Sequence, residues 1–559
     1  MSNKTPFTDN NFDFFPFTNE TIKTIKSPAD EKAAVTFADS SILETVSYEA
    51  FKRLSFTFTK EHLEHVIKAC LSPDASDNDR YVLACVLKNA DTASNGKFPL
   101  CQDTGIANIF GWKKSLFITQ NLNGKNDYEN ITEGTKHLYD EKKLRFSTTC
   151  PVNFWDEKDP KNNMPAQITI FNENSCLAPM PAFIENTPEN SMSFVFCAKG
   201  GGSSNKTSFV QGTKATLNKA AMCRFLKDQI THFGTSACPP YTIAVVAGGL
   251  SPEQNTLTLK LATAGAYDSM TYEPNPYGFR DKELEDEVKK IASETGYGAQ
   301  FGGTKFCVDA VVIRLPRHGA SCPLSAGVSC SAHRNLKVIV TEKGYYLEKT
   351  VSTPSQLPGF DDCMKFLNKN SADSSSEKTI NTDNGMTSTL SQLESCKPGD
   401  RILLSGKILV ARDAAHARWQ KLIDEGKPLP DYTTCYPVCY AGPARTPDGQ
   451  IIGSFGPTTA GRMDSYAESL MSRGAALVTL AKGNRSKTWQ DGCKKYKGFY
   501  LGTPGGIAAM IASSYIKSQK ILDYEDLGME AVRLVEVENL PCFVITDKNG
   551  NDFYEELHG

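Results

Sequence analysis

Three cysteines constrain the fold of this chain more than any other feature, because they lie far apart in the sequence and each occupies a turn of small residues. Cys101 stands in Pro-Leu-Cys-Gln-Asp, Cys238 in Ser-Ala-Cys-Pro-Pro and Cys330 in Val-Ser-Cys-Ser-Ala. Three thiolates can bind three corners of a four-iron cluster and leave one iron open as a Lewis acid, whereas electron-transfer clusters normally use four. If all three are ligands, the fold must bring distant turns into one cleft, and a hydro-lyase is favoured over an electron carrier.

The alternative for each of the 17 cysteines is a small, buried, apolar side chain. The Gly and Pro neighbours of the three favour exposed turns of the kind that carry function. The sequence contains no Cys-x-x-Cys run, which compact zinc and ferredoxin sites use. The spacing therefore favours ligands that are gathered from across a large domain.

Composition excludes several classes of protein. The 559 residues carry a formal net charge of -3, which gives no basis for binding nucleic acid or an anionic membrane surface. No apolar stretch approaches the roughly 18 residues of a membrane span. The odd number of scattered cysteines favours a reducing compartment. Residues 1–20 contain no arginine, which argues against an organellar transit peptide, so we expect a cytoplasmic protein and consider a mitochondrial one less favoured.

Hydrophobic patterns predict an α/β protein in two main parts. Apolar residues recur at helical spacing from residue 51 to residue 87, and β-branched runs at 241–247 and 310–315 are typical of buried strands. The stretch 368–389 is almost free of large apolar residues and is expected to connect domains. The resulting division is an N-terminal arm at 1–45, a first domain at 46–367, a linker at 368–396 and a second domain at 397–559.

Cations follow several of the predicted strands of the second domain. Arg412 comes after the strand-like run that ends at residue 411, Arg462 lies in a Gly-Pro-Thr-Thr-Ala-Gly-Arg turn, and Lys482 follows an apolar run. Together with Arg145 of the first domain they suit a small dicarboxylate, because arginine binds a carboxylate at two points. A single such arginine is more often only a surface ion pair. The Gly-rich loop at 199–206 could hold an anion or be a flexible turn.

His318 precedes Cys330 by a short stretch that contains a second small-residue turn. If both turns line one cleft, His318 is a natural proton donor near a metal and a carboxylate substrate. A lone histidine is otherwise structural or merely exposed.

Six motifs together closely resemble the class I, iron-sulfur-dependent fumarate hydratases, and the resemblance runs from about Ser55 to Tyr554. They are Cys-Gln-Asp-Thr-Gly at 101–105, Lys-Gly-Gly-Gly-Ser at 199–203, Ala-Cys-Pro-Pro at 237–240, Arg-His-Gly-Ala-Ser-Cys at 317–322, Gly-Val-Ser-Cys-Ser at 327–331 and Gly-Pro-Thr-Thr-Ala-Gly-Arg-Met-Asp at 456–464. The resemblance implies an N-terminal cluster-binding α/β domain joined by a linker to a C-terminal swivelling α/β domain. Tartrate dehydratase carries the same two modules as separate subunits.

The resemblance also implies roles for individual residues. Cys101, Cys238 and Cys330 would bind a [4Fe-4S] cluster. Thr458 and His318 match active-site positions, and Asp103 is the candidate that activates Thr458, since an ordinary threonine hydroxyl is a poor base. The implied substrate-binding positions are Gln102, Asp103, Arg145, Gly202, Asn205, Lys206, Thr207, Ser208, Phe209, Val210, Gln211, Arg412, Thr458, Thr459, Ala460, Gly461, Arg462 and Lys482. Ser204 and Val210 depart from the expected residues, without touching an implied ligand.

The activity that the resemblance implies is the reversible hydration of fumarate to (S)-malate, a step of the tricarboxylic acid cycle, by a homodimer. Two alternatives stay open. One is a hydro-lyase for a related diacid, tartrate or mesaconate, and the other is an iron or oxidant sensor that uses the lability of its cluster. The absence of a basic or aromatic-basic segment weighs against a sensor that binds RNA.

Overall fold

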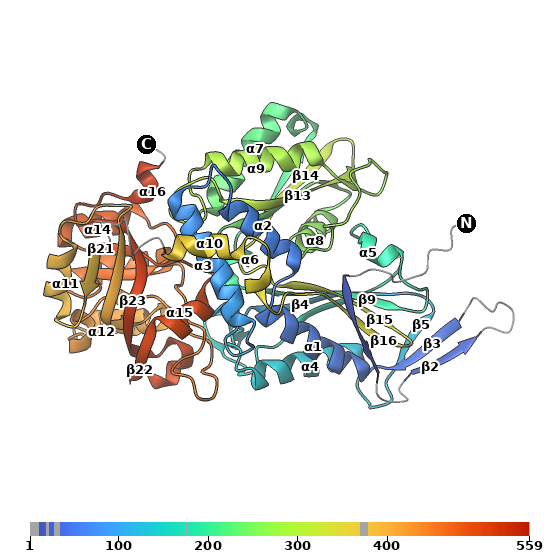
Figure 1. The fold of residues 1–559 in the computed structure, drawn as a ribbon, viewed down its shortest axis with the longest axis horizontal. Coiled ribbons are helices and arrows are strands. Elements are labelled where there is room, and N and C mark those ends of the chain that lie inside the picture. Colours follow the sequence, from blue (N-terminus) through green and yellow to red (C-terminus); the bar gives the residue numbers. More distant parts are fainter. Residues whose placement is uncertain (1–10, 18–21, 27–33, 174–176, 369–377, 558–559) are drawn as a thin grey trace.

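The computed structural model describes residues 11–17, 22–26, 34–173, 177–368 and 378–557. It is a mixed α/β structure, as predicted. Figure 1 shows the C-terminal residues, coloured orange to red, as one lobe, and the N-terminal residues as two further groups of strands with their helices. Three sheets form the framework of these parts.

The first sheet has six strands in the order β1 (Phe12–Pro16), β16 (Gly344–Glu348), β15 (Asn335–Thr341), β9 (Met192–Lys199), β4 (Ile106–Lys113) and β8 (Gln167–Asn172). Every residue of β9 is buried, and its central residues, Phe194–Ala198, are an unbroken apolar run, as expected of a strand covered on both faces. Helix α1 (Ile42–Phe56) packs on β9 and β15, and α4 (Asp127–Glu141) packs on α1. Residues of the predicted arm thus join the first domain through β1.

The second sheet has five strands in the order β10 (Ser208–Thr213), β14 (Ser321–Ser329), β11 (Tyr241–Gly249), β13 (Cys307–Arg317) and β12 (Phe279–Arg280). The strands predicted at 241–247 and 310–315 are confirmed as β11 and β13, which run parallel. Strand β10 is at the edge. The helices of this part are α2 (Lys60–Cys70), α3 (Asp77–Ala93), α7 (Lys219–Phe233), α8 (Pro252–Ala262), α9 (Lys282–Glu294) and α10 (Phe360–Asn368).

The third sheet belongs to the C-terminal lobe. Its order is β17 (Lys378–Asn381), β18 (Arg401–Val410), β19 (Val438–Cys439), β20 (Val478–Ala481), β21 (Phe499–Gly502), β23 (Val532–Thr546) and β22 (Ile516–Asp523), and an additional pairing of β18 with β23 closes a ring. Strands β18 to β21 are parallel, so their carboxyl ends meet at one end of the ring. Loops at that end are where ligands bind in folds of parallel strands.

The helices of this lobe are α11 (Gly385–Leu393), α12 (Asp413–Asp424), α13 (Ala467–Met471), α14 (Lys487–Tyr496), α15 (Ala508–Ser514) and α16 (Phe553–Glu556). Strand β17 and helix α11 correct the linker predicted at 368–396. Strand β17 pairs with β18, and Ile380 and Leu393 are fully buried. A few apolar side chains at the right spacing thus anchor a segment whose average composition is polar. Residues 369–377 of that linker lie outside the described residues.

The two halves touch directly. Helix α15 packs on α3, where the Met510 N–H donates to the Asn89 side-chain oxygen at 3.0 Å. The Ser454 hydroxyl donates to the Pro99 carbonyl at 2.7 Å, and Arg445 Nε donates to the Leu144 carbonyl at 2.8 Å. Pro99 lies two residues before Cys101, and Leu144 directly precedes Arg145, so the contact holds the segments from which the site is built.

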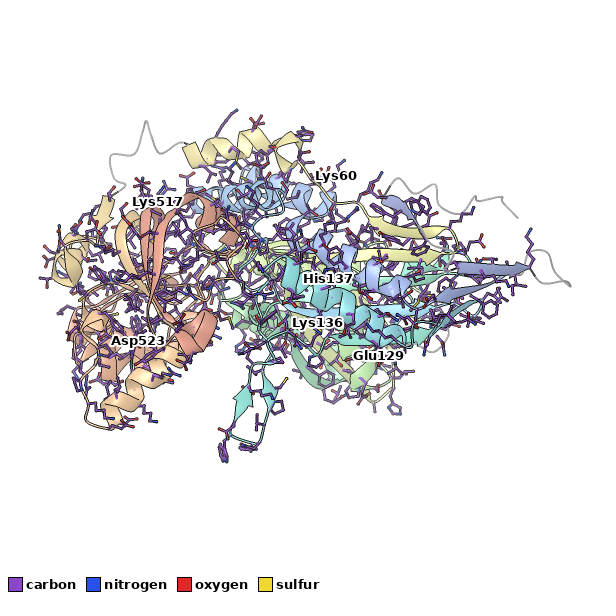
Figure 2. All side chains as sticks on the ribbon, turned by 90° about the horizontal axis from the view of Figure 1, so that it is seen from below. Lys60, Glu129, Lys136, His137, Lys517 and Asp523 are labelled. Atoms are coloured by element: carbon purple, nitrogen blue, oxygen red, sulfur yellow. The ribbon has the colours of Figure 1, made fainter. Side chains whose placement is uncertain are left out.

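Short elements complete the fold. They are β2 (Ile22–Lys26), β3 (Ala34–Asp39) and β5 (Phe117–Gln120) in a small sheet, the hairpin of β6 (Cys150–Pro151) and β7 (Glu157–Lys158), and the helices α5 (Ala182–Glu185) and α6 (Gly201–Ser204). The β6–β7 hairpin projects from the body of the molecule in Figure 2, with the side chains of Phe154 and Trp155 largely exposed. Across the described ranges, none of the helices has the length and apolar character that crossing a bilayer requires.

Candidate active site

A cavity of about 290 Å³ lies between the two halves of the molecule. Residues of both halves line it. They are Cys101, Gln102, Asp103, Arg145, Gly200, Gly201, Gly202, Ser203, Asn205, Lys206, Ser236, Ala237, Cys238, Cys330, Ala332, Arg334, Arg412, Thr458, Thr459, Arg462, Lys482 and Gly506.

Cys101 enters the cavity from the segment between α3 and β4. Backbone and side-chain bonds fix the residue before it: the Leu100 N–H donates to the Ser55 carbonyl at 3.0 Å, and Asn89 Nδ2 donates to the Leu100 carbonyl at 2.9 Å. Asn89 also accepts from α15 of the C-terminal lobe. One buried asparagine therefore couples the position of this cysteine to the docking of the two halves.

Cys238 lies in a tight turn with a left-handed backbone, at φ 62°. Its N–H donates to the Thr235 carbonyl at 3.1 Å, and its own carbonyl accepts from the Ser331 N–H at 3.0 Å. Cys330 immediately precedes Ser331 and directly follows β14. A single backbone hydrogen bond thus joins the two turns, and it places both cysteines against the same cavity.

The three thiols are close enough to influence one another. Burial raises the pKa of Cys101, and the charge of Arg334 opposes this effect. Burial raises the pKa of Cys238 to about 11 against the opposing charge of Lys482, whose Nζ donates to Cys238 Sγ at 2.7 Å. Cys330 contributes to the raised pKa of both. Three thiols that face one cavity beside cations are a suitable set for an anionic metal cluster.

The three thiols are not arranged to bind a single metal ion together. Among the described residues, no three His, Cys, Asp or Glu side chains are arranged to hold a single ion. A four-iron cluster needs no such convergence, because each thiolate binds a different iron. Cys322, which could be confused with Cys330, is fully buried on β14 opposite Gly212 and is not among the residues that line the cavity. The donor set therefore fits a cluster held at three corners.

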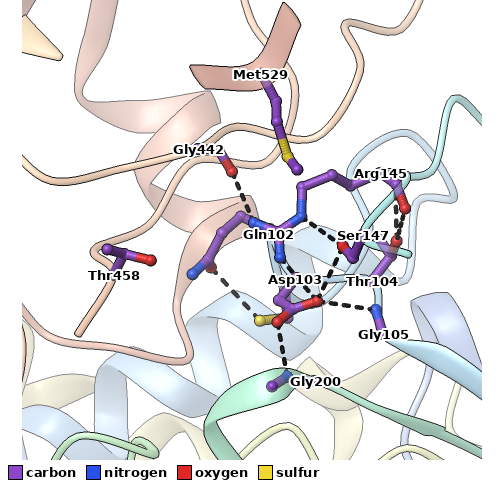
Figure 3. A network of polar contacts seen from close by, with 12 residues as sticks. Gln102, Asp103, Thr104, Gly105, Arg145, Ser147, Gly200, Gly442, Thr458 and Met529 are labelled. Carbon is purple, nitrogen blue, oxygen red and sulfur yellow. Dashed lines mark hydrogen bonds and ion pairs between the residues drawn. The ribbon is translucent and has the colours of Figure 1, made fainter. Parts of the chain in front are cut away.

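Asp103 and Arg145 belong to a network of polar contacts (Figure 3). Asp103 Oδ1 lies 2.8 Å from Arg145 Nη2, and Asp103 Oδ2 accepts from the Gly201 N–H at 3.0 Å. Burial alone would raise the pKa of the Asp103 carboxyl, but the charges of Arg145 and Arg334 and the Gly201 N–H outweigh it and hold the pKa below its usual range. Asp103 is therefore an anion that fixes the guanidinium of Arg145.

Gln102 connects the cysteine turn to the C-terminal lobe. Its Nε2 donates to the Pro457 carbonyl at 3.3 Å. The approach is so close that a Cβ at Gly456 would lie 2.5 Å from Gln102 Oε1. This glycine is thus required by the contact between the halves.

The C-terminal lobe presents its cations from the ends of parallel strands, as predicted. Arg412 follows β18 and stands at the N-cap of α12, and its guanidinium donates to Glu530 Oε1 at 2.6 Å. Lys482 follows β20, and its N–H donates to the Thr458 carbonyl at 3.1 Å. Because β18 and β20 are parallel strands of one ring, Arg412 and Lys482 leave it at the same end and reach the same cavity.

Thr458 is nearly buried and its hydroxyl accepts from Arg462 Nη2 at 3.1 Å. Arg462 also pairs with Asp413 at 3.0 Å. Within the described part of the chain, no hydrogen bond joins Thr458 to Asp103, the activator expected from the sequence. The group that contacts the Thr458 hydroxyl is instead a cation, which stabilises the deprotonated form of a hydroxyl.

Some of the implied substrate positions lie away from the cavity. Asn205, Lys206 and Gly202 line it, but Ala460 and Gly461 do not. The segment Thr207–Gln211 is also outside it, because β10 begins at Ser208 and leads away along the edge of the second sheet.

His318 does not reach the cavity of its own chain, which corrects the expectation that its turn and that of Cys330 line one cleft. It is exposed between β13 and β14, and its Nδ1 accepts from the Ala320 N–H at 3.2 Å. Cys330 follows the other end of β14, whose 9 residues at about 3.3 Å each separate the two by roughly 30 Å. A strand between two turns carries them apart.

Sequence reasoning missed Arg334, Ser236 and Gly506, which all line the cavity. Arg334 had a usable signal, since it follows Cys330 closely in Cys-Ser-Ala-His-Arg. Ser236 and Gly506 had none beyond their position in turns.

Comparison with known proteins agrees with this architecture. Residues 44–339 match the family model described as "Fumarate hydratase (Fumerase)", and residues 356–557 match "Fumarase C-terminus". The chain is 43% identical over 526 residues to fumarate hydratase 1, mitochondrial, of Leishmania major, covering 93% of this chain and 91% of that protein. It is 41% identical over 519 residues to the aerobic class I fumarate hydratase of Escherichia coli K12, covering 92% and 90%.

A further relative matches only part of this chain. The putative L(+)-tartrate dehydratase subunit beta of Methanocaldococcus jannaschii is 33% identical over 174 residues, which are 30% of this chain and 89% of that protein. Fold, cavity and matches together define a two-module hydro-lyase. The chain belongs to the class I fumarate hydratase family.

Proposed function

We propose that the protein catalyses the reversible hydration of fumarate to (S)-malate. The observation that carries the proposal is the single cavity in which three cysteine turns of one half meet Arg412, Arg462 and Lys482 of the other. The volume of about 290 Å³ suits a small molecule with two carboxylates.

In this proposal Cys101, Cys238 and Cys330 hold a [4Fe-4S] cluster. When bound, the cluster supplies a Lewis acid that makes the hydroxyl group of malate a better leaving group. Lys482 has two tasks. Burial would lower its pKa, but the neighbouring thiols, Cys238 first, raise it, so it is a cation beside the cysteines as well as beside the substrate.

The arginines of the cavity bind and orient the substrate. Arg145 is fixed by Asp103, and Arg412 by Glu530, so each presents its remaining N–H groups in a defined direction. Rigid cations stabilise the charge that accumulates on a carboxylate when the proton of the adjacent carbon leaves, because they need no reorganisation during the reaction. This is the chemical reason for surrounding a small diacid with guanidinium groups.

Thr458 is the proposed base for that proton. Its hydroxyl contacts Arg462, and its backbone is held from both sides: the Thr458 N–H donates to the Tyr440 carbonyl at 2.7 Å, and its carbonyl accepts from Lys482. The contact with a cation favours the deprotonated hydroxyl that a base requires. Asp103 serves in this proposal through Arg145 and the backbone of Gly201, and not by contact with Thr458.

The rates with malate, tartrate and mesaconate distinguish this proposal from the alternative diacids. Protein purified without oxygen and reconstituted with iron and sulfide is offered malate, tartrate and mesaconate separately, and the ultraviolet absorbance of the unsaturated diacid is followed. We expect malate to be consumed fastest. A preference for tartrate or mesaconate would instead identify a hydro-lyase for that diacid.

The proposed homodimer accounts for the distant positions of His318 and Thr207–Gln211. His318 lies in the turn that precedes β14, and all of Thr207–Gln211 except Thr207 lie on β10, which pairs with β14. Strand β10 is an edge strand that exposes Phe209 and Val210. Exposed edges with apolar side chains are suited to contact with another chain. We therefore infer that these residues reach the cavity of a second copy and not their own.

Mixed dimers test this inference. His318→Asn and Thr458→Val are each expected to be nearly inactive alone. If His318 acts across the dimer, mixing the unfolded variants and refolding them together restores one intact site per mixed dimer, or about a quarter of wild-type activity. No recovery in mixtures that contain mixed dimers would place His318 at its own site or outside the chemistry.

The proposed compartment is the cytoplasm. All 16 described cysteines are free, as expected in a reducing environment. One relative has "mitochondrial" in its name. Cell fractionation followed by immunoblotting decides between the two locations.

A further inference from the structure

Arg334 is a buried cation in the cavity wall that has no role in the chemistry described so far. It is 4% exposed, lines the cavity and directly precedes β15. Its backbone is fixed, because its carbonyl accepts from the Ala198 N–H of β9 at 3.1 Å. Its Nε is buried without a hydrogen-bond partner, and within the described ranges no carboxylate pairs with its guanidinium.

The other arginines of the cavity differ from Arg334 in this respect, because each already has a carboxylate partner. The pairs are Arg145 with Asp103 at 2.8 Å, Arg412 with Glu530 at 2.6 Å, and Arg462 with Asp413 at 3.0 Å. An ionised group that is buried without a partner is costly, by several kcal/mol. A protein retains such a group where a ligand supplies the missing charge.

The position of Arg334 defines which end of a ligand it can meet. It belongs to the N-terminal half, beside Cys101 and Asp103, on whose carboxyl its charge acts. Arg412 and Arg462 belong to the C-terminal half of the same cavity. A four-carbon trans diacid has its carboxylates at opposite ends, so it needs anion-binding groups on opposite walls.

We propose that Arg334 binds the carboxylate of the substrate that faces the N-terminal half, while the arginines of the C-terminal half bind the other. The inference rests on the proposed dicarboxylate substrate. The planar fork of arginine suits two-point binding of a carboxylate, and its burial prevents water from competing for it. Arg334 is thereby the group that makes the site select a diacid over a monoacid.

The test compares two acids that differ by one carboxylate. Succinate and propionate are titrated by calorimetry into the anaerobic, cluster-loaded protein, as wild type, Arg334→Met and Arg334→Lys. We expect Arg334→Met to weaken succinate binding by about 100-fold and propionate binding by less than about threefold, because only the diacid loses a buried charge partner. Arg334→Lys should recover part of the loss, since it restores charge without the fork.

Lys199→Met is the matched control for the loss of a nearby buried cation. Lys199 is 7% exposed, but its Nζ donates to the Thr263 carbonyl at 2.7 Å and it is not among the residues that line the cavity. We expect its succinate affinity to stay within about threefold of wild type, since a charge that does not touch the ligand acts weakly on it. An equal loss in Lys199→Met would show a general effect of charge and would overturn the proposal.

Two further readouts separate the possible failures. Iron and acid-labile sulfide are measured in every sample, and a loss of both in Arg334→Met would show that Arg334 serves the cysteines. Equal weakening of succinate and propionate, or no weakening of either, would also overturn the assignment. Turnover of malate by the wild type tests the proposed function separately, because the binding measurements do not depend on it.

Discussion

Replacing Gly505 with alanine tests whether Cys238 is held where a cluster ligand must be. Gly505 lies in the turn between β21 and α15, close to Cys238 Sγ. Its N–H donates to Gln300 Oε1 at 2.7 Å, and its carbonyl accepts from Gln300 Nε2 at 2.9 Å. Gln300 Nε2 also donates to the Pro239 carbonyl at 2.9 Å. One buried amide therefore holds Gly505 against the Cys238 turn.

The added methyl group has no free space. It would overlap Cys238 Sγ and would lie 3.1 Å from Lys482 Cδ. Relief requires the thiol to move by about 1 Å, since unbonded atoms need about 3.5 Å, or Gln300 to give up two hydrogen bonds at about 1 kcal/mol each. The cost is about 1–3 kcal/mol, and we expect the side chain of Cys238 to yield before the backbone.

The assay measures iron and sulfide per chain after anaerobic reconstitution, with malate turnover and circular dichroism on the same samples. Gly505→Ala should keep its fold and lose at least about tenfold in loaded cluster and turnover, which corresponds to about 1.4 kcal/mol. Gly327→Ala is the control. Gly327 lies on β14, the strand that leads to Cys330, and its added Cβ would meet Leu259 Cδ2 at an ordinary 3.4 Å. Full loading and turnover of Gly505→Ala would refute the placement of Cys238.

Three other predictions test the site and its support. Cys330→Ser should lose iron and sulfide while Cys322→Ser keeps both, because only Cys330 lines the cavity; the reverse result would exchange their roles. Arg412→Lys should lower kcat/KM in steady-state assays by an amount that corresponds to about 2–4 kcal/mol of lost transition-state stabilisation, since lysine cannot hold Glu530 and a carboxylate together. Unchanged kinetics would contradict this role. Burial lowers the pKa of His416 from 6.5 to about 4, so its contribution to stability is complete above pH 6.5 and is lost as the pH falls toward 4. The free energy of unfolding in urea should therefore fall between pH 6.5 and pH 4 by up to about 3 kcal/mol more in wild type than in His416→Asn. An equal fall in the two proteins would contradict the burial of His416.

Local patterns predicted the elements that position the site. The strand before Arg412 and the apolar run before Lys482 are confirmed as β18 and β20, because a run of apolar residues followed by a polar turn determines where a strand ends. The strands at 241–247 and 310–315 are confirmed for the same reason. The α/β class followed from these patterns.

Tertiary relations were beyond the sequence. The expectation that His318 and Cys330 line one cleft of the same chain was corrected, because a turn signal does not say which end of a strand faces the cavity. We expected Asp103 to contact Thr458 and missed the contact of Thr458 with Arg462. The distance between Asp103 and Thr458 depends on how the two lobes dock, which the sequence does not show. Gln300 was not found at all, because an amide that bridges Pro239 and Gly505 has no local signature.

The halves that build the cavity belong to one chain, so each meets the other at an effective concentration on the order of millimolar, as covalently joined partners do. The Methanocaldococcus relative, which is named as a subunit beta, spans only 30% of this chain. Here the halves share one hydrophobic core cluster and are also joined by hydrogen bonds, among them those of Met510 and Ser454. The covalent connection thus keeps both walls of the cavity in place when the protein is dilute, without reliance on affinity alone.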